Sequence, residues 1–386
     1  MISNPVDTDG VVRTRVPRRL ASLLALLGVT FAAAGQARAG GFEVGETTTK
    51  STARGGTGVA TKSDPSALYF NPALLPRADG FQVLANLNAI DMNLEFQRDD
   101  LVVTKNRQEQ RTSFEPSENE APPGPVPSMG LTYDFGVDNL AVGVGLFTPS
   151  AYGERCFGTW EEGECKADPQ GGARHLLVHS RLVDLYLTGG IGYQFDLNNG
   201  SLSIGASGMA TYLEADFELI VNVELPPNPP WEENPENEAL FSGKKMSAWN
   251  FTGVLGIAYA SDDGLHLGAS WRPQMTWEAN GKASIDFSED LESIGAGLTD
   301  DEITFRTVQA GSLRVGMAYA EGEHPGDPDR PLYDIEVNGV WENWSAVDNF
   351  EMEPHGDLSA SELPDAAQEG LPELNTIVQT KNWQDT

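Results

Sequence analysis

The sequence predicts an all-β protein, an antiparallel transmembrane β-barrel whose lumen holds an N-terminal plug. Three observations support this fold class. An apolar export signal opens the chain, a Gly-, Ser- and Thr-rich segment follows, and two-residue alternation of apolar and polar residues fills the remainder. These features predict a signal peptide over residues 1–39, an N-terminal hatch over residues 40–79 and a barrel with long loops over residues 80–386.

The first 39 residues have the parts of a secretory signal. Arginines precede an apolar run at residues 20–34, and Ala37-Arg38-Ala39 fits the small-x-small cleavage rule. An uncleaved membrane anchor is the alternative, but the run is short for a hydrocarbon core of about 30 Å. Gly40 is therefore the expected first mature residue, and the expected destination is the outer membrane.

The expected hatch contains no barrel-like strand. Residues 40–75 are rich in Gly, Ser and Thr and end in Asp64-Pro-Ser-Ala-Leu-Tyr-Phe-Asn-Pro-Ala73. Two prolines and an Asn in so short a stretch favour turns and side-chain hydrogen bonds to the backbone. We therefore expect Asn71 and Pro72 to brace a compact segment rather than to touch a ligand.

Strand-like alternation begins after Pro76. Apolar side chains occupy odd positions over residues 81–87 and even positions over residues 90–96, and this slip predicts a β-bulge. About ten strands are expected in all, at residues 81–96, 128–135, 140–146, 183–193, 202–206, 251–259, 265–271, 313–319, 333–341 and 376–385. One face of each strand is small and polar, and we expect it to face the lumen because the apolar face meets lipid.

Short turns and long loops alternate along the chain. Residues 196–200 and 261–264 read as tight turns, whereas residues 99–125, 148–175, 220–245, 280–308 and 349–375 read as long polar loops. This one-sided pattern is typical of outer-membrane barrels rather than of soluble β-sandwiches. Aromatic residues near strand ends predict interfacial girdles: Tyr193, Phe195, Tyr259, Trp271, Trp277, Tyr319, Trp341 and Trp344.

Charge and cysteine content restrict the partners. The formal net charge of −32 disfavours nucleic acid, because such binding depends on Lys and Arg contacts to phosphate. Cys156 and Cys165 are expected to form a disulfide in an exported protein. No metal site is expected, since His175 and His179 would lie about 13 Å apart in a strand. His179-Ser180 does not form a hydrolytic dyad, because neighbours in a strand point to opposite faces, and no enzyme activity is expected.

The chain resembles the FadL/TodX-type family of outer-membrane transporters for hydrophobic compounds. The residues that carry the resemblance are Gly-Gly-Phe at the mature start, Ala53-Arg54-Gly-Gly-Thr-Gly-Val-Ala60 and the segment that ends in Asn71-Pro72-Ala73. Residues 140–153 resemble the third strand of the family and the loop after it. The family barrel has 14 strands and about ten are visible here, so we expect the chain to be truncated at its C-terminus.

The resemblance implies passive transport with no cofactor. A hydrophobic solute enters through the long loops, binds near the hatch and leaves sideways through the third strand. Phe42, Asn71, Pro72 and Ala73 are then the hatch residues. Gly143, Gly145 and Pro149 are the lateral-gate candidates, although the glycines could instead make room in the lumen.

The implied substrate is a long-chain fatty acid, and an aromatic hydrocarbon is the alternative within the family. A non-transporting adhesive barrel is the alternative from another class, but it has no need of a hatch. We expect a monomer in contact with outer-membrane lipid and lipopolysaccharide, and no nucleic-acid partner.

Overall fold

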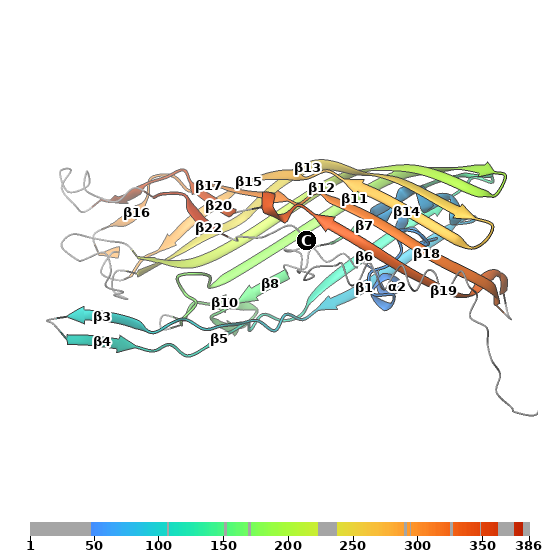
Figure 1. Cartoon of the computed structure of the whole chain (residues 1–386). Helices are drawn as coiled ribbons and strands as arrows, with labels where there is room; N and C mark the ends of the chain where they lie inside the picture. The colour runs from blue at the N-terminus through green and yellow to red at the C-terminus, as the bar shows by residue number, and fades with distance from the viewer. Residues whose placement is uncertain are drawn as a thin grey trace, which may run out of the picture. The chain divides into compact units, whose positions relative to one another are not determined.

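A single antiparallel sheet of 14 strand segments dominates the structure (Figure 1). The computed structural model describes residues 48–105, 108–149, 153–168, 171–222, 238–288, 292–293, 295–324, 327–347, 349–361 and 374–380. The 14 segments are β1 (Gln82–Ile90), β6 (Gly124–Tyr133), β7 (Leu140–Phe147), β8 (Gly153–Cys156), β11 (His179–Leu197), β12 (Gly200–Asn222), β13 (Glu238–Ser261), β14 (Leu265–Arg272), β15 (Met275–Asp286), β17 (Glu302–Gln309), β18 (Ser312–His324), β19 (Asp327–Glu342), β20 (Asn349–Pro354) and β22 (Ile377–Thr380).

Four of the strands are interrupted, so the 14 segments correspond to ten strands, as the alternation predicts. β7 and β8 both pair with β11, β14 and β15 both pair with β13, and β17 and β18 follow the same register on β15 and β14. β19 and β20 continue on β18 and β17. Within the described residues, β1 pairs only with β6 and β19 only with β18.

Among the residues that the structure describes, four two-stranded sheets lie outside the main sheet. They pair β2 (Glu95–Phe96) with β5 (Ser117–Glu118), β3 (Leu101–Lys105) with β4 (Gln108–Thr112), β9 (Thr159–Glu161) with β10 (Glu164–Lys166), and β16 (Ala296–Leu298) with β21 (Leu358–Ala360). Residues 280–308, expected as a loop, contain the end of β15 and all of β17 except Gln309. The ladder therefore extends further toward the loop side than the alternation alone predicts.

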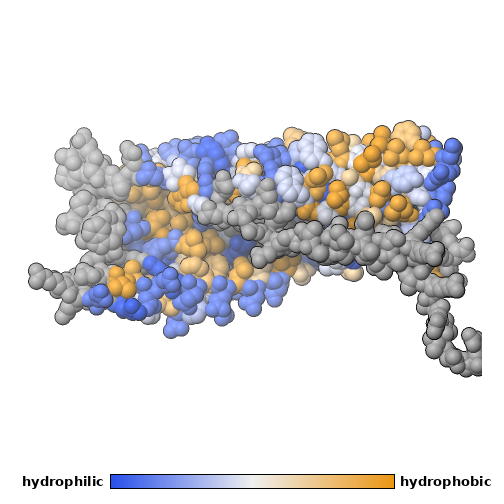
Figure 2. Space-filling view, viewed as in Figure 1, coloured by the Kyte–Doolittle hydropathy of each residue, from blue (hydrophilic) through white to orange (hydrophobic). Residues whose placement is uncertain are grey.

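The two faces of the sheet differ from one end to the other. Near the short turns the outer face carries exposed apolar side chains such as Leu187, Ile257 and Val315, and Figure 2 shows apolar side chains gathered over that part of the surface. Toward the long loops the inner face is apolar instead. There a buried cluster, hereafter the inner apolar cluster, includes Trp277, Phe305 and Phe350.

Two sequence-based interpretations are wrong for this reason. Trp277 and Trp344 are not interfacial, because both are fully buried in the inner apolar cluster. The slip in alternation near residue 88 is not a β-bulge, because β1 keeps one register with β6 from Gln82 to Ile90. The apolar positions change face there because the apolar side chains move from the outer face to the inner face of the strand. A register shift does occur between Ala215 and Phe217 of β12, opposite β13.

Residues 48–78, the N-terminal segment, fold against the inner face of the sheet. They contain α2 (Thr49–Ala53), α3 (Ala67–Phe70) and the 3-10 helix η1 (Pro72–Arg77). α3 and η1 are almost wholly buried, and they pack with side chains of β7, β11, β12 and β13. The segment lies at the end of the sheet that carries the apolar outer surface (Figure 1).

Glycines of the sheet make room for this segment. A Cβ atom on Gly205 would overlap the backbone of Pro72 and Ala73, and one on Gly190 would lie 2.8 Å from Leu68 Cδ2. Similar approaches to residues 59–76 occur at eight glycines on seven strands: Gly130, Gly143, Gly190, Gly192, Gly205, Gly256, Gly268 and Gly316. The small inward residues noted in the sequence thus form the docking surface of the N-terminal segment.

Candidate functional site

Asn71 and Pro72 brace the N-terminal segment. The Asn71 side chain accepts from the Ala73 backbone N–H at the start of η1 and donates to the carbonyls of Val59, at 2.8 Å, and Ile257, at 3.3 Å. Because Asn71 is fully buried, these bonds replace those that water would supply. Ala73 lies in the same turn against Gly205. Phe42, the fourth expected hatch residue, lies outside the described residues.

Two carboxylates of β19 hold the N-terminal part of this segment. Arg54 donates to both carboxylate oxygens of Asp334, at 3.0 and 2.7 Å, and to Glu336 at 3.3 Å. Glu336 also accepts from the backbone N–H groups of Gly58 and Ala60, each at 3.0 Å, and from the Thr61 hydroxyl. The bond to Asp334 raises the pKa of Arg54, so the guanidinium stays charged throughout the physiological range.

Lys62 is a buried cation at the centre of the segment. Its Nζ donates to Ser51 Oγ at 3.1 Å and lies 3.3 Å from the centre of the Phe70 ring. Burial lowers the pKa of Lys62 to about 7, against the opposing attraction of Asp64. Ring contact favours the protonated amine, whereas desolvation favours the neutral one.

Two arginines of the sheet lie directly above α3. Arg272 donates to the Tyr69 hydroxyl and to the Ala310 carbonyl, both at 3.2 Å. Arg314 lies over the rings of Tyr69 and Phe70, at 5.4 and 5.7 Å, and is 3% exposed. Among the described residues Arg314 makes no hydrogen bond or ion pair. A buried guanidinium at the boundary between α3 and the inner apolar cluster is suited to an anionic group.

Three neighbouring strands are interrupted beside these arginines. β14 ends at Arg272 and β15 follows it. In the same way β17 ends at Gln309 before β18, and β19 ends at Glu342 before β20. Asn343 ties the interruptions together, since its side chain accepts from the Gly311 N–H at 2.5 Å and donates to Gln274 at 2.7 Å. The 3-10 helix η3 (Trp344–Ala346) follows and places Trp344 in the inner apolar cluster.

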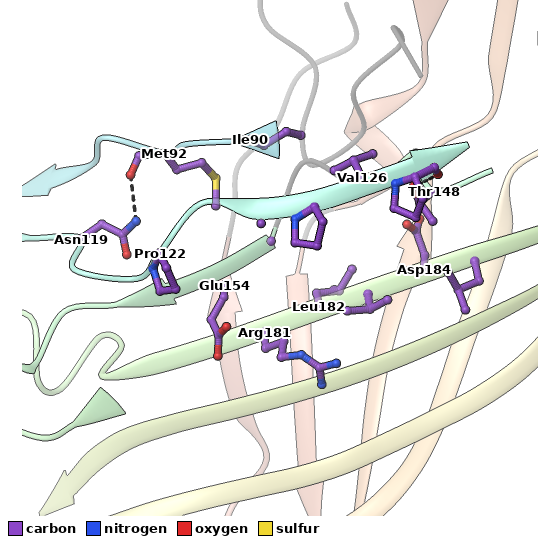
Figure 3. A pocket seen from close by; sticks show the side chains of 16 residues that line it. Ile90, Met92, Asn119, Pro122, Val126, Thr148, Glu154, Arg181, Leu182 and Asp184 are labelled. Atoms are coloured by element: carbon purple, nitrogen blue, oxygen red, sulfur yellow. Dashed lines mark hydrogen bonds between the residues drawn. The ribbon is translucent and has the colours of Figure 1, made fainter. Parts of the chain in front are cut away.

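A cavity of about 360 Å³ lies in the opposite part of the wall (Figure 3). It coincides with the interruption between β7 and β8, where residues 183–185 of β11 face the missing part of the ladder. Its lining is mainly apolar and includes Ile90, Met92, Val126, Pro127 and Leu185. A hydrogen-bonded ladder closes the wall elsewhere between these strands, so this cavity is where an apolar solute could cross it.

Charged groups border one end of this cavity. Arg181 lines it, but its guanidinium turns away and pairs with Glu214 at 2.8 Å and Asp216 at 3.2 Å (Figure 3). The Glu154 carboxylate lies 3.0 Å from the imidazole Nε2 of His179. The apolar part of the lining thus ends where ion pairs begin.

The three expected gate residues are distributed around this interruption. Gly143 and Gly145 lie within the continuous β7 ladder, opposite Gly190 and Thr188. The Gly143 Cα faces Leu68, so it also makes room for the N-terminal segment. Pro149 is buried and lies in the interruption, which begins after Phe147. Only Pro149 of the three therefore lies in the gap itself.

Cys156 and Cys165 form a disulfide, as expected. It joins β8 to the β9–β10 hairpin, directly beyond the interruption. Closing a loop this short contributes about 2–3 kcal/mol on the chain-entropy model. The bridge therefore stabilises the loop-side border of the cavity.

The described residues contain no helix that is long and apolar enough to cross a membrane. Within the same part of the chain, no group of three or more His, Cys, Asp or Glu side chains is arranged to hold a metal ion. The groups brought together here are apolar side chains, buried arginines and hydrogen-bonded backbone.

Comparison with known proteins identifies the family. The model of the outer membrane protein transport protein family (OMPP1/FadL/TodX) matches residues 30–386. The chain belongs to this family. Its members are outer-membrane transport channels for hydrophobic compounds and are not enzymes. No curated protein sequence matches the chain.

Solved structures show the same fold at low sequence identity. A Pseudomonas aeruginosa FadL homologue aligns with a TM-score of 0.67 and 16% identity, over 90% of this chain and 76% of that one. The P. putida toluene transporter TodX aligns with a TM-score of 0.56 and 19% identity, over 89% and 78%. The Ralstonia pickettii toluene transporter TbuX gives 0.54 and 16%, over 87% and 78%.

Sequence reasoning missed Lys62, Arg272 and Arg314 as functional candidates. The alternation does place both arginines on the inward face, each between apolar outward neighbours. A cation on that face of a predicted membrane strand is the signal that could have identified them. Lys62 carries no such signal, because its burial depends on contacts with residues distant in the sequence.

Proposed function

We propose that this chain is a passive outer-membrane transporter of long-chain fatty acids, in which the N-terminal segment acts as a hatch and the solute leaves through the wall cavity. Three arrangements support this. Arg272 links α3 to the inner apolar cluster through the Tyr69 hydroxyl and the Ala310 carbonyl. Arg314 lies over two rings of α3. The cavity interrupts the wall beside β7, which itself contacts Leu68.

The observation that carries the fatty-acid assignment is Arg314. Its guanidinium is buried beside the rings of Tyr69 and Phe70 and has no carboxylate partner among the described residues. A buried cation is costly unless an opposite charge accompanies it. A fatty-acid carboxylate would supply that charge while its acyl chain occupies the apolar region. A hydrocarbon such as toluene, which the solved relatives TodX and TbuX transport, has no such group.

Partition of the solute into lipid drives its lateral release, so transport needs no nucleotide or cofactor. Moving an acyl chain into lipid buries apolar area at roughly 25 cal/mol per Å². The apolar lining of the cavity offers a path on which that area never meets water. Signal cleavage after Ala39, contact with lipid and lipopolysaccharide, and a monomeric state belong to the same proposal.

Ligand binding to the purified protein tests the substrate class. Oleate should bind at least tenfold more weakly to Arg314→Met than to the wild type, because hydrogen bonds to charged groups contribute about 1.5–3 kcal/mol. Toluene binding should not change. Arg306→Met is the matched control, since Arg306 lies on the outer face of the adjoining β17, paired with Glu278 and Glu353. Equal oleate affinity in wild type and Arg314→Met would favour an aromatic hydrocarbon as substrate.

Uptake by cells tests the hatch. Deleting residues 42–75 should change the rate of labelled oleate uptake per molecule of folded protein in the membrane, because it removes the segment that fills the inner face between β6 and β18. A deletion that leaves uptake unchanged and abolishes only surface attachment would contradict transport and favour an adhesive barrel.

A further inference from the structure

Four buried polar side chains lie next to one another on the inner face, beyond the two arginines. Trp277, Thr307, Gln309 and Ser312 are each at most 3% exposed. Their polar atoms, Trp277 Nε1, Thr307 Oγ1, Ser312 Oγ and both Oε1 and Nε2 of Gln309, have no hydrogen-bond partner among the described residues. Buried polar groups without partners are rare in folded proteins, so this cluster requires an explanation.

The strand register places these residues in one row. Trp277 of β15 is opposite Thr307 of β17, Met275 is opposite Gln309, and Arg272 of β14 is opposite Ser312 of β18. Thr307 and Gln309 are two residues apart and share a face. The row therefore runs from the arginines beside α3 to Trp277 in the inner apolar cluster.

Gln309 differs from its neighbours because its amide carries both a donor and an acceptor. Leaving both atoms of a buried amide unpaired costs free energy twice, once for each group. Leu or Met in its place would remove that cost and match Met275 across the ladder. A single partner that accepts from Nε2 and donates to Oε1 would satisfy both atoms at once.

We propose that Gln309 is a subsite for the uncharged carboxyl group of the substrate, which it binds by two hydrogen bonds. The hydroxyl of a neutral carboxylic acid donates to Oε1, and its carbonyl accepts from Nε2. Thr307 and Trp277 offer the next hydrogen-bonding atoms along the row. This inference rests on the proposed fatty-acid transport and adds to it a second, neutral site that is separate from Arg314.

The surroundings explain why the neutral form is bound here. The inner apolar cluster disfavours a charged carboxylate, as apolar burial does for any carboxyl group. Gln309 therefore carries the head group through the apolar part of the path as the acid. Nearer to α3, Arg272 and Arg314 then favour the ionised form.

Two uncharged ligands separate this subsite from the arginine site. Oleamide can both donate to and accept from Gln309, whereas methyl oleate can only accept. We would measure both dissociation constants for detergent-purified full-length protein, as wild type, Gln309→Leu and Gln309→Met. The quantity compared is the methyl oleate to oleamide ratio of dissociation constants, since differences in partition into detergent cancel between variants. Ser203→Ala is the control, because Ser203 is a buried, unpartnered side chain on β12.

The ratio should fall about fivefold in both Gln309 variants and stay unchanged in Ser203→Ala, because in the Gln309 variants oleamide loses one hydrogen bond more than methyl oleate does. Methyl oleate itself should bind about fivefold more weakly to both Gln309 variants, because its carbonyl loses the bond from Nε2, and should be unaffected by Ser203→Ala. A ratio that is the same in wild type and in both Gln309 variants would overturn the subsite, even if oleate binding still depends on Arg314. If wild-type protein binds neither oleate nor the two neutral ligands, the transport proposal and the subsite both fail.

Discussion

Arg54 donates to both carboxylate oxygens of Asp334 and thereby ties the N-terminal segment to β19, 280 residues further along the chain. The contact joins the C-terminal end of α2 to β19, and it therefore holds the N-terminal segment against the sheet. The Arg54 side chain is 29% exposed, and solvent therefore weakens the pair without dominating it.

A double-mutant cycle on Arg54→Met and Asp334→Asn should give a coupling free energy of about 1 kcal/mol. The measurement is the free energy of local opening, from hydrogen exchange of the amides in residues 48–62. Lys50 and Asp64 provide the control, because they lie within the same segment and Lys50 is 58% exposed. Equal coupling free energies in both cycles would mean that the bond between Arg54 and Asp334 of β19 stabilises the segment no more than an exposed ion pair within it does.

The glycine docking surface predicts a contrast between two residues of β12. Gly205→Ala should lower the free energy of unfolding by roughly 1–3 kcal/mol, because the new methyl group would overlap the backbone of Pro72. Gly208→Ala should be neutral, since a Cβ atom there meets no atom within 4 Å. Thermal unfolding of the two variants in the same detergent checks this. Equal destabilisation would indicate a general strand effect rather than docking.

Filling the wall cavity should slow release of the substrate. Val126 lines the cavity, and Val126→Trp should reduce the initial rate of labelled oleate uptake several-fold without changing oleate affinity. Val144→Trp makes the same change on an exposed position of β7 outside the cavity. Uptake that slows equally in both variants would place the exit elsewhere.

The buried Lys62 predicts a dependence of stability on pH. Its pKa in the folded protein is about 7, below the ordinary value of 10.5, because burial disfavours the charge. Between these two values the unfolded chain binds one more proton than the folded one, so stability rises with pH from about 7 to about 10. Below pH 7 both states bind the proton and this contribution is lost.

Chymotryptic cleavage in residues 67–70 at pH 7, 8 and 9 can detect this change. Cleavage of the wild type should slow with rising pH relative to Lys62→Met, which cannot titrate. Lys282→Met serves as the control because that side chain is exposed on β15 and is not among the charges that shift the pKa of Lys62, and it should follow the wild type. A constant ratio between wild type and Lys62→Met at all three pH values would contradict the lowered pKa.

The sequence predicted the sheet better than it predicted which face is apolar. Two-residue alternation is the same whether apolar side chains meet lipid or fill the interior. For that reason the interfacial position expected for Trp277 and the β-bulge expected near residue 88 are both wrong. The contacts of Gly205 and Arg54 were not predictable, since their partners are distant in the sequence. Gln309 does leave a trace, because it is a polar residue on the face that carries Phe305 and Ile303.

The eight docking glycines also bear on how the protein assembles. Their partners occupy residues 59–76, which precede every strand of the main sheet in the chain. Each strand from β6 to β18 can therefore be added against a surface that is already present, in the order of synthesis. The N-terminal segment then acts as a template that sets the curvature of the wall. A chain that lacks this segment should assemble incorrectly, and this defect should be detectable as a smaller amount of folded protein.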